Sequence, residues 1–252
     1  MAAASEIVFA VLLGLLVGSF LNVVVHRLPL GESLARPRSR CVGCGTQIAA
    51  YDNVPVLSWI VLRGRCRHCG AAVSARYPAI EALTGVVFGA VVAVGGFDDT
   101  LLLELPFAAM LIAVAAIDLE HRIVPNKILL PLAIWAVAGW ALVDLEFLPE
   151  AAASGAGAFA FLLLAALAYP SGMGMGDVKL AGVMGLYLGL AVVPAMLVAF
   201  LAGSIVGVAM IAREGATARK KGVPFAPFLA LGGLVGLLAG DELISLYADR
   251  FL

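Results

Sequence analysis

The chain has 252 residues, of which 63% are hydrophobic and only 13% are charged, about half the charged share of ordinary globular domains. Its mean hydropathy is +1.06. This composition excludes a soluble enzyme. It also excludes a disordered chain, because disorder requires low hydrophobicity and high charge. The four cysteines lie between positions 41 and 69, too few and too clustered for a disulfide scaffold.

Long apolar runs follow one another, most of them near the roughly 20 residues that an α-helix needs to cross a bilayer. The first lacks a basic start and continues into Asn22–Arg27, so we expect a retained helix rather than a signal peptide. The run Val178–Ala212 would be about 52 Å long as one helix, so we expect two helices that turn near Leu190–Pro194. The expected spans are Ile7–Val25, Tyr77–Val94, Leu101–Ile117, Ile128–Val143, Ala151–Tyr169, the two halves of Val178–Ala212, and Phe225–Tyr247.

Basic residues set the expected orientation. With eight spans, fifteen of the sixteen Lys and Arg residues fall on one side, and only Arg250 falls on the other. Seven spans would move a late basic cluster to the wrong side. Since Lys and Arg favour the cytoplasmic side, we expect the first connection, 26–76, in the cytoplasm and both termini outside.

Two Cys-x-x-Cys pairs lie in this first connection, and Gly45 and Gly70 follow them, as tight knuckles require. Four thiolates suit a tetrahedral Zn²⁺ site, and a site closed by four sulfur atoms is typical of a structural metal. The alternatives are a metal-free reduced loop and a redox pair, and we expect His68 to be a solvated loop residue. The predicted ligands are Cys41, Cys44, Cys66 and Cys69.

The sequence therefore predicts an all-α polytopic membrane protein with about eight transmembrane helices. A small zinc-ribbon-like cytoplasmic loop domain is expected between helices 1 and 2. The expected domains are a first transmembrane helix (1–25), the zinc-binding loop (26–76) and a membrane-embedded domain of about seven helices (77–252). Gly182, Gly185 and Gly189 recur at spacings that favour close helix packing.

Two acids mark the ends of predicted spans. Asp118 closes one run, and Asp177 opens another within Gly174-Met-Gly176-Asp177. A charge at membrane depth is costly, so it raises a functional hypothesis. Two carboxylates about 3 Å apart share one proton, and the ionised one activates water, which is the chemistry of aspartic proteolysis. The alternative is a pair of interfacial acids beside glycine-mediated helix packing.

Together these motifs resemble the type IV prepilin peptidase family, and the resemblance covers nearly the whole chain. Segments similar to the family's signatures are Gly18–Pro29 in the first helix, Arg38–Cys44, Asn53–Trp59 and Leu62–Cys69 in the zinc loop, Ser74–Glu81 at the second helix, Asp118 with Pro125-Asn126, and Gly174–Lys179.

The resemblance implies a bacterial inner-membrane enzyme with two activities. It cleaves the leaders of type 4 prepilins and type II secretion pseudopilins after a glycine, and it methylates the new N-terminal residue with S-adenosylmethionine. It implies that Asp118 and Asp177 are catalytic and that the four cysteines bind the metal. Candidate substrate-binding residues are Gly174, Gly176 and Lys179, and candidates for methyl transfer or its cofactor are Glu81 and Arg76.

Two other functions stay open: a peptidase without methylation, and a non-enzymatic transport or assembly subunit with a zinc loop. Membrane lipid is the expected partner of the interfacial arginines Arg27 and Arg76. We expect no nucleic-acid binding, because Arg219–Lys221 is typical of a positive-inside anchor.

Overall fold

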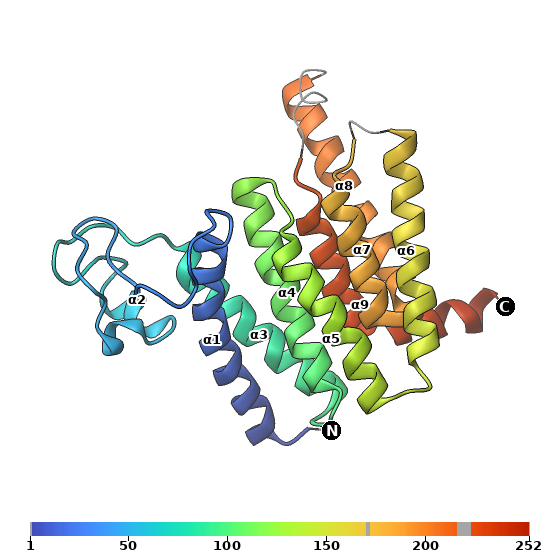
Figure 1. The fold of residues 1–252 in the computed structure, drawn as a ribbon, viewed down its shortest axis with the longest axis horizontal. Helices are drawn as coiled ribbons and strands as arrows, with labels where there is room; N and C mark the ends of the chain where they lie inside the picture. The colour runs from blue at the N-terminus through green and yellow to red at the C-terminus, as the bar shows by residue number, and fades with distance from the viewer. Residues whose placement is uncertain (1, 170–171, 216–222, 252) are drawn as a thin grey trace. The chain divides into compact units, whose positions relative to one another are not determined.

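The computed structural model describes residues 2–169, 172–215 and 223–251, so the predicted anchor Arg219–Lys221 lies outside the described residues. The described residues form helices and loops, with two isolated β-bridges in the first connection. The elements are α1 Ala4–Arg27, η1 Ala50–Asn53, α2 Leu57–Val61, α3 Arg76–Gly95, α4 Leu101–His121, α5 Asn126–Val143, α6 Leu148–Ala168, α7 Met175–Leu188, η2 Gly189–Ala191, α8 Val192–Glu214 and α9 Ala226–Phe251 (Figure 1).

Seven segments of the described chain are long and apolar enough to cross a membrane. One of them, Met175–Glu214, consists of α7 and α8 joined by η2, so the prediction of two helices in this run is confirmed. The turn comes earlier than expected, at Gly189–Ala191, and Pro194 lies in the first turn of α8, where its missing N–H costs little. The chain is an all-α, multi-pass membrane protein.

The chain forms two compact units, Met1–Phe97 and Asp98–Leu252. In the first unit, α1 and α3 pack through glycines: a Cβ on Gly14 would lie 2.6 Å from the Thr84 carbonyl oxygen, and a Cβ on Gly18 would lie 2.7 Å from the Glu81 Cα. Buried Asn22 donates from Nδ2 to the Tyr77 carbonyl at 3.0 Å. These contacts fix the register of the two helices.

In the second unit, α7 is the central helix, and ten of its fourteen residues are buried. Helices α4, α5, α6 and α9 pack around it (Figure 1). The Phe107 ring of α4 stacks on the Tyr187 ring of α7 with centroids 4.5 Å apart. Trp140 of α5 donates from Nε1 to the Leu186 carbonyl at 3.0 Å. These contacts hold the short α7 inside the bundle.

Glycines bring α6 and α7 together. A Cβ on Gly185 would lie 2.6 Å from the Gly155 Cα, and a Cβ on Gly182 would lie 3.2 Å from the Phe159 Cβ, so the predicted packing role of both glycines is confirmed. Gly189 differs, because it lies in the η2 turn with φ +54° beside the Phe147 ring. Its position requires the conformational freedom of glycine at a turn.

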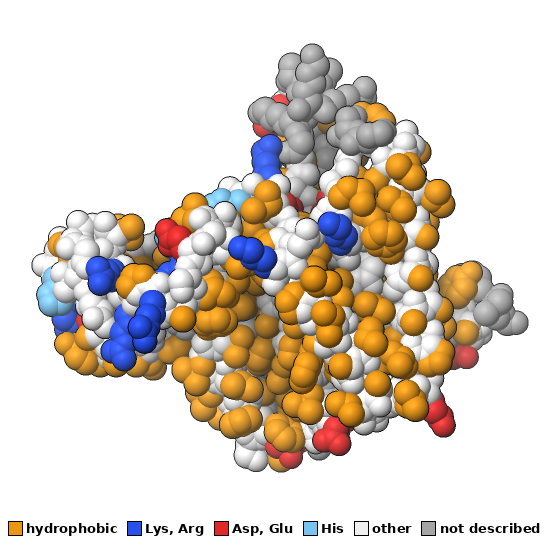
Figure 2. Space-filling model, viewed as in Figure 1, with side chains coloured by type: hydrophobic (Ala, Val, Ile, Leu, Met, Phe, Trp, Pro, Cys, Tyr) orange, Lys and Arg blue, Asp and Glu red, His pale blue; other side chains and the backbone are white. Residues whose placement is uncertain are grey.

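Charged side chains mark the ends of the bundle. The ends of α4 and α8 and the starts of α5 and α7 carry Arg122, Arg213, Lys127 and Lys179. On the second unit, Figure 2 shows hydrophobic side chains over most of the face in view, acidic side chains at the lower edge, and Lys and Arg side chains nearer the other end. This pattern is typical of a helical bundle that crosses a bilayer.

The α6–α7 contact predicts a difference between two glycine substitutions. Gly185→Ala places a methyl group against backbone, so we expect overpacking of about 1–3 kcal/mol and an unfolding temperature lower by about 5 °C in detergent. Gly157→Ala on α6 is the control, because a Cβ there meets no atom within 4 Å. Thermal unfolding curves check this, and equal temperatures for both variants would contradict the packing role.

Candidate functional site

The two cysteine pairs form matching knuckles in the first unit. In the first, the Cys41 N–H donates to the Thr46 carbonyl at 2.9 Å, and the Gly45 N–H donates to the Cys41 carbonyl at 2.8 Å. Cys66, Ala71 and Gly70 repeat both bonds at 2.8 and 2.9 Å. Gly45 and Gly70 have φ near +70°, which explains why glycine follows each pair.

The knuckles bring the four thiols into one cluster. The four Sγ atoms all lie within 4.8 Å of one another, and those of Cys41 and Cys69 are 3.7 Å apart. A tetrahedral Zn²⁺ with bonds of about 2.3 Å separates its sulfur ligands by about 3.8 Å. The Thr46 hydroxyl, 3.3 Å from the Cys44 Sγ, lowers the pKa of that thiol to about 6, whereas the neighbouring thiols raise the pKa of Cys69 to about 11. The donor set therefore fits zinc, and His68 does not belong to the cluster.

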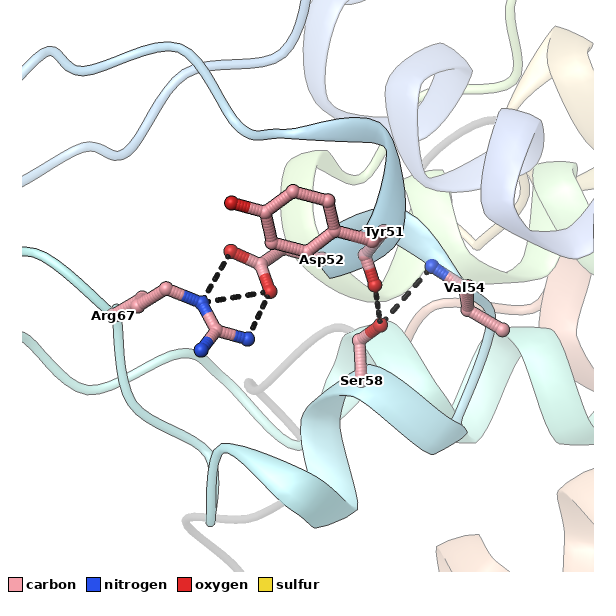
Figure 3. A network of polar contacts seen from close by, with 5 residues as sticks. All are labelled: Tyr51, Asp52, Val54, Ser58 and Arg67. Atoms are coloured by element: carbon pink, nitrogen blue, oxygen red, sulfur yellow. Dashed lines mark hydrogen bonds and ion pairs between the residues drawn. The ribbon is translucent and has the colours of Figure 1, made fainter.

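A polar network joins the second knuckle to η1 and α2 (Figure 3). Arg67 donates from Nε and Nη2 to the Asp52 carboxylate at 2.6 to 3.0 Å, and this contact lowers the pKa of Asp52. The Ser58 hydroxyl donates to the Tyr51 carbonyl at 3.0 Å and accepts the Val54 N–H at 3.1 Å. The network orients α2 relative to the cysteine cluster.

A strained turn attaches this loop to α3. The Leu57 N–H donates to the Pro55 carbonyl at 2.6 Å, which closes a γ-turn with Val56 at φ +60° and ψ −50°. A β-branched residue rarely adopts this conformation. The turn aims the Val56 N–H at the buried Glu81 Oε2, 2.7 Å away. Glu81 therefore holds the loop to the second turn of α3 through a charge-assisted hydrogen bond.

The other residue considered for methyl transfer, Arg76, begins α3. Its guanidinium lies over the Tyr77 ring, 5.0 Å from the centroid. Glu81 and Arg76 are both in the first unit, where Glu81 contacts the loop at Val56 and packs against Gly18 of α1, and Arg76 contacts Tyr77.

A cavity of about 330 Å³ also lies in the first unit, beside the end of α1. Arg27 donates to the carbonyls of Ser33 and Pro37, at 3.0 and 2.8 Å, and so closes one side of it. Its lining includes two arginines but no acidic residue: Val23, Arg27, Leu34, Ala35, Pro37, Arg38, Ser39, Ile48, Ala50 and Asn53.

The second unit contains a pair of buried acids. Asp118 in the last turn of α4 is 6% exposed, and Asp177 in the first turn of α7 is 8% exposed. Asp118 lies close enough to act electrostatically on Asp177. Among the described residues, the only other buried acid is Glu81. The fold thus brings together the two acids that the sequence singled out.

Each aspartate lies beside a helix N-terminus: Asp118 next to the start of α9, and Asp177 in the first turn of α7. The Asp118 Oδ2 accepts the N–H of Ala226, the first residue of α9, at 3.2 Å. The Asp177 N–H donates to the carbonyl of Gly174, the N-cap of α7, at 3.1 Å. Helix N-termini offer unpaired N–H groups and a favourable dipole to a carboxylate. Sequence reasoning missed Ala226, because no local motif marks a donor 108 residues away.

The α4–α5 connection, residues 122–125, and the start of α5 pack against the first turn of α7. A Cβ on Gly176 would lie 2.7 Å from the Val124 Cβ, and Lys179 donates from Nζ to the Asn126 Oδ1 at 3.1 Å. A Cβ on Gly174 would meet only the Asp177 Oδ2, at 3.5 Å, and the Gly176 nitrogen. Of the three candidate substrate-binding residues, Gly176 thus contacts this loop, Lys179 contacts the first residue of α5, and Gly174 lies beside the Asp177 carboxylate.

The cysteine cluster predicts one zinc ion per chain, measurable by elemental analysis of the purified protein. Cys66→Ser removes one of four sulfur ligands, so we expect its zinc content to fall to less than about a tenth after dialysis against a mild chelator. His68→Ala is the matched control in the same knuckle and should keep its zinc. Loss of zinc from the His68 variant would show that the ligand set is different.

The Val56–Glu81 bond predicts that Glu81 protects the loop from proteolysis. Glu81→Leu leaves the Val56 N–H without its acceptor, at a cost of about 1–3 kcal/mol, so trypsin should cleave after Arg63 and Arg65 roughly 5- to 150-fold faster. Glu81→Gln keeps an acceptor oxygen and should change the rate much less. Cleavage of the Leu variant at the unmodified rate would refute this attachment.

Comparisons with known proteins agree with this architecture. Residues 12–94 match the model of the bacterial peptidase A24 N-terminal domain, and residues 105–212 match that of the type IV leader peptidase family. No solved structure matches the chain significantly.

Three curated relatives carry the name prepilin leader peptidase/N-methyltransferase. That of Burkholderia pseudomallei (strain 1026b) is 39% identical over 93% of this chain and 86% of its own. That of Stutzerimonas stutzeri is 35% identical, covering 94% of this chain and 92% of its own. That of Bacillus subtilis (strain 168) is 32% identical, covering 95% and 96%. Similarity of this extent over both units shows that the chain belongs to the type IV leader peptidase family.

Proposed function

We propose that this chain is a membrane aspartyl endopeptidase that removes the leader of type IV prepilins and then methylates the new N-terminal residue. The observation that carries the peptidase is the burial of Asp118 and Asp177 together at one end of an apolar bundle. The printed names of the relatives supply the substrate class and the methyl transfer.

In the proposed cleavage, the ionised carboxylate takes a proton from a water molecule, whose oxygen attacks the scissile carbonyl carbon. The protonated carboxylate gives its proton to the carbonyl oxygen. The tetrahedral intermediate collapses as the C–N bond breaks: the leaving amine takes up the proton that the base had removed from water, and a hydroxyl of the intermediate returns a proton to the other carboxylate. The Ala226 N–H and the positive charge of Arg122 both stabilise an ionised Asp118. We therefore assign Asp118 as the base and Asp177 as the acid.

The proposed substrate position follows from the bundle. Gly174 has no side chain beside the Asp177 carboxylate, so an extended peptide can approach Asp177 closely, while Gly176 and Lys179 shape the site through their contacts with Val124 and Asn126. The basic residues at this end favour the cytoplasmic face of the bacterial inner membrane, with both termini outside. A leader that stays in the cytoplasm then has its cleavage point beside the aspartates, and pseudopilins of type II secretion share this geometry.

Zinc in this proposal is structural. Cys41, Cys44, Cys66 and Cys69 would hold it, and the ion supplies cross-linking of the two knuckles rather than chemistry at the substrate. Through Arg67, Asp52 and Val56 the cluster orients the loop 26–76 against α3. The zinc loop and the aspartates lie in separate units, which supports separate roles for residues 26–76 and the membrane domain.

S-adenosylmethionine is the methyl donor that the relatives' names imply. It carries one carboxylate together with an ammonium and a sulfonium group. The cavity beside α1 offers Arg27 and Arg38 to a carboxylate but no acidic side chain to the two positive charges. The cavity therefore does not fit the whole molecule, and no residue of this chain is assigned to the methyl donor.

The intact mass of a purified prepilin tests both activities after incubation with the protein and S-adenosylmethionine in detergent. We expect loss of the leader and a gain of one methyl group. Loss of the leader alone would keep the peptidase and remove the methyl transfer. An unchanged mass, for a prepilin that another peptidase cleaves, would favour a non-enzymatic membrane subunit.

The aspartate pair predicts the effect of conservative substitutions. Asp118→Asn and Asp177→Asn each remove one member of the acid–base pair, so we expect leader cleavage to slow at least about a thousandfold. Glu104→Gln is the control, because Glu104 is a partly buried acid at the opposite end of the helix that carries Asp118. Cleavage rates from gel densitometry check this, and an active Asp177 variant would overturn the proposed mechanism.

A further inference from the structure

The short helix α2 exposes its apolar side chains. Leu57 is 62% exposed, Ile60 58% and Val61 74%, although α2 lies in the connection between two membrane helices. Val54, just before α2, is also exposed. A cluster of this kind on a protein surface marks a contact with another apolar phase or partner.

The level of α2 along the transmembrane helices indicates which apolar phase it contacts. Its N-cap residue, Val56, bonds to Glu81, which lies five residues after the start of α3. At 1.5 Å per residue this is about 7.5 Å along a helix long and apolar enough to cross a membrane. Gly18 of α1 packs on the Glu81 Cα at the same level, and α1 continues for nine residues beyond it. The start of α2 is therefore level with the membrane-spanning parts of α1 and α3.

The charged residues around α2 indicate the kind of membrane surface that it suits. Residues 53–67 contain no acid, and exposed Arg63 and Arg65 follow α2 directly. The nearest acid in the sequence, Asp52, is paired with Arg67. An apolar face beside basic residues is typical of a segment that lies in the interface of an anionic bilayer.

We propose that α2 lies in the membrane interface, where Leu57, Ile60 and Val61 contact acyl chains and Arg63 and Arg65 contact the headgroups of anionic phospholipids. The zinc loop then contacts the bilayer directly through α2, in addition to its covalent connections to α1 and α3 and its hydrogen bond to Glu81. The γ-turn at Val56 sets the level of α2, because it fixes the start of the helix to Glu81.

Photocrosslinking of the full chain in nanodiscs tests this proposal. Benzoylphenylalanine replaces Val61 in one protein and Val42 in the control, since Val42 is 94% exposed at the tip of the first knuckle. In nanodiscs of phosphatidylglycerol and phosphatidylcholine, we expect lipid adducts by mass spectrometry at least about fivefold more abundant at position 61. Equal yields at the two positions, or no lipid adduct at position 61, would overturn the proposal.

A second comparison tests the charges. Arg63→Gln together with Arg65→Gln should lower the adduct yield at position 61 in the anionic nanodiscs and leave it unchanged in pure phosphatidylcholine. An added prepilin that displaces the lipid adducts and crosslinks to position 61 instead would assign the surface to a protein partner and refute the lipid contact. The experiment gives the same result with the Asp118→Asn protein, so its failure is distinct from failure of the proposed peptidase.

Discussion

A carboxylate buried in an apolar helix needs a hydrogen-bond donor, and this requirement organises both units. Backbone N–H groups at the starts of helices meet it: Val56 at the start of α2 serves Glu81, and Ala226 at the start of α9 serves Asp118. Asp177 lies in the first turn of its own helix. Because these N–H groups have no partner within their helices, each bond satisfies an acid and a helix end together. The acids thus determine where separate elements meet.

The buried acids differ in the groups that contact their carboxylates. Glu81 binds a strained turn and fixes the zinc loop to α3, so its carboxylate is committed to structure. Asp118 and Asp177 lie within electrostatic range of each other, and beside Asp177 the chain carries Gly174, which has no side chain. Burial alone does not distinguish these roles, because all three acids are buried. The groups that contact each carboxylate distinguish them.

Glycine makes this arrangement possible in helices that have few polar side chains. Gly14 and Gly18 let α1 approach α3, and Gly155 and Gly185 let α6 approach α7. Close approach replaces the hydrophobic effect as the source of helix association inside lipid, where dispersion contacts between backbones count most. The packed α7 then holds Asp177 in place, and the packed α3 holds Glu81.

Local patterns in the sequence determined much of this protein. Apolar runs of membrane-spanning length predicted the helices, paired cysteines followed by glycine predicted the thiol cluster, and acids at the ends of Leu101–Ile117 and Val178–Ala212 marked the candidate pair. These signals are local, because helix length, knuckle geometry and the cost of a charge in lipid depend on neighbouring residues. Only the tertiary structure decided that Ala226 serves Asp118, that a γ-turn at Val56 reaches Glu81, and that Lys179 binds Asn126. Each of these bonds joins segments distant in the chain, and such partners are set by packing, which no local pattern records.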